Sequence, residues 1–223
     1  MPLILPMPNC LVLVRHAEAV NNILSRKDRT RDKGFSTYHC PLTRRGREQA
    51  ALLGEWLKRT YSFDRYFCSP YERALETFRI AYPRITPSVD ARLSELRRGI
   101  EDLLTDKQIE KLLPWSEKKR KEREGRFHFK PLNGESWADK EMWLRSFLLT
   151  LQVECRGQQV VVFGHGKTDP VWGKIFGNWS GEQTIIGYEK HPPENASVTA
   201  YRHKDGKMVL EFSNFAPWEK KKK

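Results

Sequence analysis

Two short apolar runs that each lead into a histidine constrain the fold of this chain more than any other feature. Residues 11–14 are followed by Arg15 and His16, and residues 160–163 are followed by a glycine-flanked His165. Short continuous apolar runs are typical of strands that are covered on both faces, as in parallel sheets. Open α/β folds bind ligands at the carboxyl ends of such strands. We therefore expect the polar residues after both runs to converge on one site at one edge of a sheet.

Further apolar runs alternate with helical patterns along the chain, and this alternation is typical of layered α/β proteins. Additional strands are predicted at residues 66–68, 197–201 and 208–212. Helices are predicted at residues 43–58 and at about 136–155, because Thr43 and Ser136 are favourable N-cap residues. The fold class that follows is α/β, a three-layer α/β/α sandwich with a mainly parallel central sheet.

The segment 99–133 interrupts this alternation and looks inserted into it. One short helix is predicted after Thr105, and a second is predicted from residue 116 to residue 125. We interpret residues 1–223 as a single domain that carries the segment as a helical lid. Residues 219–223 are interpreted as a basic tail.

The charge balance favours anionic ligands. The chain of 223 residues carries a formal net charge of +12, to which the last four lysines contribute. Basic residues also concentrate between Lys118 and Arg126. This second concentration indicates either a solvated helix face or a lid that attracts phosphate.

Hydropathy and cysteine spacing exclude several classes of protein. No apolar run approaches the roughly 20 residues that a bilayer-spanning helix requires, so we expect no membrane partner. The N-terminus lacks the pattern of a signal peptide, so we expect a cytoplasmic protein. The cysteines have neither zinc-site nor CxxC spacing, and they are Cys10, Cys40, Cys68 and Cys155. Reduced thiols and no metal site are therefore expected.

The predicted strand 66–68 leads into a segment with the features of an anion-binding helix start. Ser69 can cap a helix, Pro70 suits its first position, and Glu72 completes a capping-box spacing. We therefore expect the helix to start at Ser69. Arg73 would then lie one turn in and reach back to the N-terminus, where free N–H groups bind phosphate. A well-capped helix with an exposed arginine is the alternative interpretation.

Together with Glu95, these segments resemble the motifs of the histidine phosphatase superfamily, which has the phosphoglycerate-mutase-like fold. The resemblance extends from about Leu11 to about Gly166 and keeps the order of the family's motifs. The matching residues are Arg15-His16-Ala17-Glu18 with Asn22, 42–50, 69–77, Glu95, 133–136 and Gly164-His165-Gly166. The resemblance implies a phosphate-handling enzyme that requires no metal ion and no other cofactor.

The resemblance also implies a role for each candidate residue. His16 corresponds to the nucleophile that becomes a phosphohistidine, and Glu95 corresponds to the proton donor. His165 counts as catalytic as well. The residues that correspond to ligands of the phosphate oxygens are Arg15, Asn22, Arg73 and His165. Because nearby guanidinium groups oppose protonation of an imidazole, we expect His16 to stay neutral and nucleophilic near pH 7.

The expected activity is metal-independent hydrolysis of a small phosphorylated metabolite, a phosphomonoester. The alternative within the family is a 2,3-bisphosphoglycerate-dependent phosphoglycerate mutase. Only 70 positions separate Glu95 from His165, which is shorter than in the true mutases and favours a phosphatase. The sequence leaves the identity of the metabolite and the oligomeric state open.

Two other classes of protein have weaker support. Val161 stands where a P-loop requires its first glycine, and the loop before Gly166 is too short for that motif. A sequence pI of about 9.6 and seven tryptophans suggest a nucleic-acid-binding protein. The basic residues do not alternate with aromatic ones as in RNA-binding motifs, so we expect no nucleic-acid partner.

Overall fold

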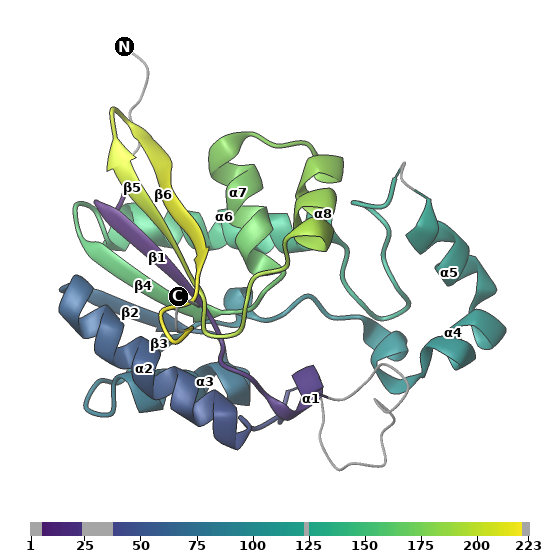
Figure 1. Ribbon diagram of the computed structural model, residues 1–223. Helices are drawn as coiled ribbons and strands as arrows, with labels where there is room; N and C mark the ends of the chain where they lie inside the picture. Colours follow the sequence, from purple (N-terminus) through teal and green to yellow (C-terminus); the bar gives the residue numbers. More distant parts are fainter. Residues whose placement is uncertain (1–5, 24–37, 123–124, 220–223) are drawn as a thin grey trace.

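The computed structural model describes residues 6–23, 38–122 and 125–219, and a six-stranded sheet lies at its centre (Figure 1). The strand order is β3-β2-β4-β1-β5-β6. The strand bounds are β1 Cys10–Arg15, β2 Arg65–Cys68, β3 Ser88–Val89, β4 Gln159–Gly164, β5 Val198–Lys204 and β6 Lys207–Phe215. The pairs β1–β4, β2–β4 and β2–β3 are parallel, whereas β5 is antiparallel to both of its neighbours. The prediction of a mainly parallel sheet is confirmed.

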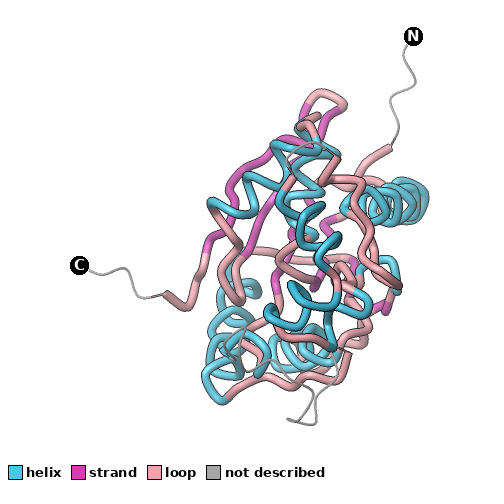
Figure 2. The backbone as a smooth tube through the Cα atoms, turned by 90° about the vertical axis from the view of Figure 1, so that its right-hand side faces the viewer, coloured by secondary structure: helices cyan, strands magenta, loops and turns pink. Residues whose placement is uncertain are grey.

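Both faces of the sheet are covered by helices, which explains the continuous apolar runs (Figure 2). Successive side chains of a strand point to opposite faces. In β1, Val12 and Val14 belong to one core, whereas Leu11 and Leu13 belong to the other. The helices that contribute to the first core are α2 (Arg44–Thr60) and α3 (Glu72–Ala81), and those of the second are α6 (Trp137–Glu154) and α7 (Thr168–Gly177). The predicted three-layer arrangement is confirmed.

The predicted N-caps are present at three helix starts. Thr43 accepts a hydrogen bond from Gly46 N at the start of α2. Ser136 and Thr105 each form a full capping box with the residue three positions on, and they begin α6 and α4 (Asp106–Leu112). Side-chain acceptors at these positions bind N–H groups that have no partner within the helix.

The second helix of segment 99–133 differs from the prediction. Helix α5 spans Pro114–Lys121, so it begins before Ser116 and ends before Gly125. Proline suits the first helical position because its φ is already helical and no hydrogen-bond donor is lost there. Ser116 is therefore the third residue of the helix, and its hydroxyl donates to the buried carboxylate of Glu101.

Several short elements are not predicted by the sequence patterns. These are β3, α1 (Val20–Ile23), the 3-10 helices η2 (Ala91–Leu93) and η3 (Gly99–Leu103), α7 and α8 (Gly181–Lys190). Most of them span too few residues to establish a periodic apolar pattern. Helix α7 is longer, and it directly follows the loop that carries His165.

The segment 99–133 extends to one side of the sheet, with α4 and α5 at its far end (Figure 1). Backbone hydrogen bonds close the segment and attach it to the start of α6: Ile100 N donates to Leu132 O at 3.0 Å and Ala138 N to Phe127 O at 3.1 Å. The basic run 118–126 includes positions 123 and 124, which lie outside the described residues, as does the tail 220–223. None of the described helices combines the length and apolar character that a membrane span requires.

Candidate functional site

A single guanidinium joins the two histidines that follow β1 and β4. Arg73 Nε donates to His16 Nε2 at 3.0 Å, and Arg73 Nη2 donates to His165 Nδ1 at 3.1 Å. The two imidazole centroids lie 5.4 Å apart. All three residues are at most 2% exposed. The structure therefore brings together three of the predicted residues, which with Arg15 we call the histidine pocket.

Hydrogen bonds at both ring nitrogens define the tautomer of His16. Its Nδ1 lies 2.8 Å from the carbonyl oxygen of Ala17, which can only accept, so this nitrogen carries the proton. Nε2 accepts from Arg73, so it is unprotonated, and its single in-plane electron pair points to the guanidinium. His16 N also donates to Gly164 O at 3.0 Å, which ties the end of β1 to the end of β4. The geometry presents Nε2 as a nucleophile.

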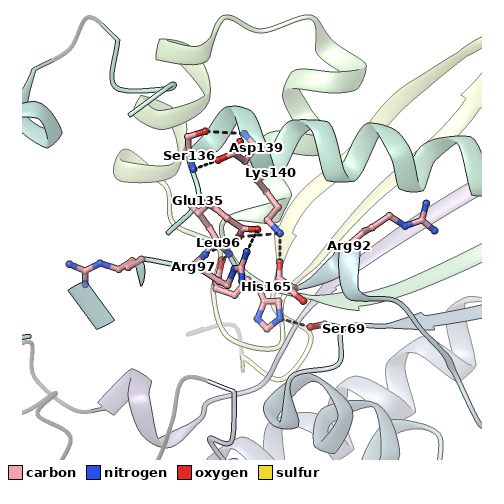
Figure 3. Close-up of polar contacts among 12 residues, drawn as sticks. Ser69, Arg92, Leu96, Arg97, Glu135, Ser136, Asp139, Lys140 and His165 are labelled. Atoms are coloured by element: carbon pink, nitrogen blue, oxygen red, sulfur yellow. Dashed lines mark hydrogen bonds and ion pairs between the residues drawn. The ribbon is translucent and has the colours of Figure 1, made fainter. Parts of the chain in front are cut away.

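His165 has the complementary arrangement. Nδ1 accepts from Arg73, so the proton lies on Nε2, which is 2.8 Å from Ser69 Oγ (Figure 3). Thr168 Oγ1 donates to the carbonyl oxygen of His165 at 2.6 Å and fixes the turn after β4. The edge of the His165 ring also contacts Tyr71, with centroids 5.1 Å apart. Both imidazole orientations are thus determined by partners outside the reacting face.

The prediction that Ser69 caps α3 is wrong. The helix begins at Glu72 with Tyr71 as its N-cap residue, and no side chain caps it. The hydroxyl of Ser69 is bonded to His165 instead, and it accepts from Tyr71 N at 3.3 Å. Because the helix starts later than predicted, Arg73 lies at its second position. The guanidinium still reaches the helix N-terminal end, and it is buried, which excludes the alternative of an exposed arginine.

Burial and positive charge both favour neutral imidazoles in the histidine pocket. Burial lowers the pKa of His16 well below its usual value, and the charges of Arg73 and Arg15 lower it further. The pKa of His165 is also well below its usual value, again through burial first and then through Arg73. A neutral His16 can attack phosphorus at physiological pH, whereas a protonated one has no free electron pair.

Arg15 lies at the edge of the histidine pocket and has an uncommitted donor. One of its terminal nitrogens donates to Pro193 O. Within the described residues, its buried Nε has no hydrogen-bond partner. A Cβ at position 166 would lie 3.1 Å from this Nε, so the glycine after His165 makes room for the guanidinium. A buried N–H group of a cationic side chain that has no hydrogen-bond partner is suited to bind an anionic ligand.

The two remaining predicted residues lie next to the histidine pocket. Asn22, at the end of α1, accepts from Ala19 N at 2.9 Å and from Asn195 Nδ2 at 3.1 Å. Its oxygen thus shapes the loop after His16. Glu95 is half-buried, and its Oε1 accepts from Leu96 N at 2.8 Å. Burial lowers the pKa of Arg73, and Glu95 is the charge that opposes this most strongly.

Three residues near the pocket were missed by the sequence analysis. Tyr71 stacks on the guanidinium of Arg73 at 4.9 Å. Asn195 donates to the carbonyl oxygen of His16 at 3.2 Å. Burial raises the pKa of Asp169 to about 7, while the charge of Arg15 opposes this. Tyr71 and Asp169 lie inside or beside recognised motifs and could have been considered, whereas Asn195 is distant along the chain and carries no local signal.

Comparison with known proteins assigns the family. A sequence model described as the histidine phosphatase superfamily, branch 1, matches residues 11–216. The chain therefore belongs to this superfamily, as its motifs indicate. None of the curated proteins compared with the chain matches it.

Among the described residues, no group of three or more His, Cys, Asp or Glu side chains could hold a metal ion.

Several solved structures share the fold over nearly the whole chain. An open reading frame product from Mycobacterium tuberculosis is 22% identical with a TM-score of 0.73, covering 94% of this chain and 98% of its own. A putative alpha-ribazole-5'-P phosphatase from Escherichia coli is 22% identical with a TM-score of 0.74, covering 93% and 96%. A mycobacterial glucosyl-3-phosphoglycerate phosphatase in complex with VO3 is 24% identical with a TM-score of 0.72, covering 93% and 99%. These similarities establish the fold.

Proposed function

We propose that the protein is a metal-independent phosphomonoesterase that acts on a small phosphorylated metabolite through a phosphohistidine on His16. The observation that carries the proposal is the bridge from Arg73 to both imidazoles, which leaves His16 Nε2 unprotonated. A phosphate group that enters between them would receive the N–H donors of Arg73 and face the nucleophile. Membership of the superfamily and the phosphatases among the similar structures support this assignment.

In the first step, His16 Nε2 attacks phosphorus and the bond from phosphorus to the ester oxygen breaks. Glu95 gives its proton to the departing oxygen, because an unprotonated alkoxide is a poor leaving group. In the second step, Glu95 takes a proton from water, whose oxygen attacks the phosphohistidine and releases inorganic phosphate. The ligands proposed for the phosphate oxygens are Arg15, Asn22, Arg73 and His165. For His165 this role requires that the proton moves to Nδ1 when phosphate displaces the contact with Arg73, and Nε2 then accepts from the hydroxyl of Ser69.

The protein groups supply the positive charge that phosphoryl transfer requires. Little covalent work remains beyond in-line placement and stabilisation of charge on the equatorial oxygens. Arg73 is held by Tyr71 and the two histidines. Arg15 is held by Pro193 O, and its Nε is left as a cationic donor without a partner. Donors that are oriented before substrate binds cost no reorganisation during the reaction. Wild-type turnover is therefore expected to persist in excess EDTA.

The test is turnover of 4-nitrophenyl phosphate in EDTA by the wild-type protein, His16→Ala and a matched control, His128→Ala. His128 lies in the segment 99–133, outside the histidine pocket. We expect His16→Ala to lose at least about 10⁴-fold in kcat, as is typical for removal of a nucleophile, and His128→Ala to keep full turnover. Equal rates for wild type and His16→Ala would reject the proposal.

A second measurement separates the phosphatase from the mutase alternative. The protein is incubated with phosphorylated metabolites, with and without added 2,3-bisphosphoglycerate, and the products are identified. Inorganic phosphate as the main product supports the phosphatase, whereas an isomer that forms only with the bisphosphate supports the mutase. Acid-labile, base-stable phosphate on His16 is expected in either case.

We also propose that the protein acts in the cytoplasm. All four cysteines are buried free thiols: Cys10, Cys40, Cys68 and Cys155. Proteins of oxidising compartments more often pair their cysteines. Fractionation of the cells that produce the chain tests this, and recovery from a secreted fraction would contradict it.

A further inference from the structure

A buried lysine that the proposed mechanism does not use lies beside the histidine pocket. Lys140, in the first turn of α6, has a side chain that is 1% exposed. Its Nζ donates to the carbonyl oxygen of Ser94 at 2.7 Å and lies 4.0 Å from Glu135 Oε2 (Figure 3). Burying an ammonium group is costly unless partners compensate, so a buried lysine at this position calls for a specific role.

Lys140 and Glu135 hold the backbone on both sides of Glu95. Lys140 binds the carbonyl of Ser94, the residue before Glu95. Glu135 Oε2 accepts from Arg97 N at 3.1 Å, and Glu135 N donates to Arg97 O at 2.8 Å (Figure 3). The short segment that carries the proposed proton donor is thus attached at two points to the start of α6. Lys140 and Glu135, which form these attachments, are both buried.

The charge of Lys140 also reaches the reacting groups. Burial lowers the pKa of Lys140, and the carboxylates of Glu135 and then Glu95 oppose this. Burial, Arg73 and His16 lower the pKa of His165, and Lys140 adds to this effect. The ammonium group is therefore close enough to Glu95 and to His165 to interact with both.

We propose that Lys140 is a positioning residue that holds the carboxyl of Glu95 at the leaving-group oxygen by fixing the carbonyl of Ser94. This inference rests on the proposed function, in which Glu95 donates the proton. A displaced Glu95 matters most when the leaving group is a poor one, because such a group must be protonated as the ester bond breaks. The step that expels the leaving group should therefore become more sensitive to leaving-group basicity when Lys140 is replaced.

The experiment compares Lys140→Met with a matched control, Lys130→Met. Lys130 forms an exposed ion pair at 3.1 Å with Asp139 at the same end of α6, so its loss tests general loosening of the helix start. Single-turnover phosphorylation of His16 is measured with 4-nitrophenyl phosphate, whose leaving group needs little protonation, and with glycerol 2-phosphate, whose leaving group needs it.

We expect Lys140→Met to slow phosphorylation by glycerol 2-phosphate about 10²-fold, near the low end for general acid catalysis, and by the aryl ester only several-fold. Lys130→Met should leave both rates within about twofold, as is usual for an exposed ion pair. Equal losses of Lys140→Met on the two esters, or no loss, would overturn the inference, because a purely structural role does not distinguish leaving groups.

Glu95→Gln makes failure of this inference distinguishable from failure of the proposed function. If Glu95→Gln slows the two esters equally, Glu95 is not the proton donor and both proposals fail on that point. If Glu95→Gln is selective and Lys140→Met is not, only the role of Lys140 is rejected. In the double variant, Lys140→Met should cause no further loss with glycerol 2-phosphate, because coupled residues are not additive.

A second substitution keeps the test decisive if Lys140→Met does not fold. Lys140→Gln retains an N–H donor for Ser94 O without the charge, and folding of each variant is followed by thermal unfolding. Relative to the wild-type protein, Lys140→Gln should slow phosphorylation by glycerol 2-phosphate less than tenfold and leave the aryl ester unaffected if the hydrogen bond positions Glu95. Wild-type rates of a folded Lys140→Gln on both esters would support the hydrogen bond to Ser94 as the positioning contact, whereas equal loss on both esters would refute positioning.

Discussion

The histidine pocket and the segment 99–133 differ in how their side chains are held. In the pocket, His16, Arg73 and His165 are nearly inaccessible to solvent and are bonded to one another. In the segment, large apolar side chains are exposed, including Leu112 at 58% and Trp115 at 48%. Within the segment, Ile109 is completely buried, and Ser116 and Glu101 form a buried contact.

This difference indicates which region can vary. The pocket depends on the register of the sheet, in which Arg15 pairs with Gly164 across β1 and β4, so a change there displaces several reacting groups together. The segment is attached mainly at its ends, and changes within it leave the register intact. We therefore expect phosphoryl transfer to depend on the pocket and substrate choice to depend on the segment. Four experiments test this comparison, in order of decreasing effect.

The largest effect is expected for Arg73→Met, compared with Arg79→Met on the exposed side of the same helix. Arg73 donates to both imidazoles, so its loss removes a preorganised cation and leaves two ring nitrogens without their partner. Turnover of 4-nitrophenyl phosphate should fall about 10³-fold, as for other lost transition-state donors. Arg79→Met should keep full turnover, and a loss below tenfold for Arg73→Met would contradict the central place of this bridge.

A smaller effect is expected for Gly166→Ala. The added Cβ would lie 3.1 Å from Arg15 Nε, so the guanidinium has to shift by a few tenths of an ångström. Inhibition by vanadate should weaken about tenfold, because charge-assisted donors are sensitive to geometry. Gly187→Ala on α8, where a Cβ meets nothing within 4 Å, is the matched control and should be neutral. Equal inhibition constants in the two variants would show that Arg15 does not contact the anion.

A substitution in the interior of segment 99–133, Ile109→Ala, should change the turnover of the aryl phosphate little. Ile109 is completely buried within it, and Ile109→Ala removes contacts worth about 2–5 kcal/mol in a well-packed site. Faster hydrogen exchange is expected across α4 and α5, with kcat for 4-nitrophenyl phosphate within about twofold. The relative rates among larger phosphorylated metabolites should change. A large loss on the aryl ester would mean that the segment supports the pocket directly.

The smallest effect is expected for a change of pH. Between pH 8 and pH 6, His16 and His165 should not become protonated. Burial and Arg73 hold both pKa values well below the usual range, so the ring nitrogen chemical shifts should stay constant in nuclear magnetic resonance spectra. Unfolded histidines bind protons near pH 6.5, whereas these folded ones do not. The free energy of unfolding should therefore fall as the pH drops below about 6.5. A midpoint near 6.5 for either ring would contradict the neutral pocket.

Local patterns predicted five of the six strands and the starts of three helices, α2, α4 and α6. The apolar runs before His16 and His165 became the neighbouring strands β1 and β4, because strands covered on both faces need apolar residues at every position. Thr43, Thr105 and Ser136 cap helices because a side-chain oxygen can bind an adjacent N–H group without help from the rest of the fold. The resemblance to a family added the candidate residues between these elements.

A tertiary contact explains one of the two helix starts that were predicted wrongly. Ser69 has the local context of a helix cap, but the sequence does not indicate that its hydroxyl also binds His165. His165 is brought to Ser69 by the parallel pairing of β2 with β4. A buried ring N–H without an acceptor is costly, so the contact with His165 is favoured, and Ser69 lies outside α3, which begins at Glu72.

The sequence by itself determined which residue types lie at the ends of the buried strands, because apolar periodicity and capping act over a few positions. Only the tertiary structure decided which atoms meet: that one guanidinium reaches both imidazoles, that each ring has its proton on the outer nitrogen, and that Lys140 holds Ser94 from another helix. These contacts join residues far apart along the chain. Their geometry depends on strand register and helix packing, which no local pattern encodes.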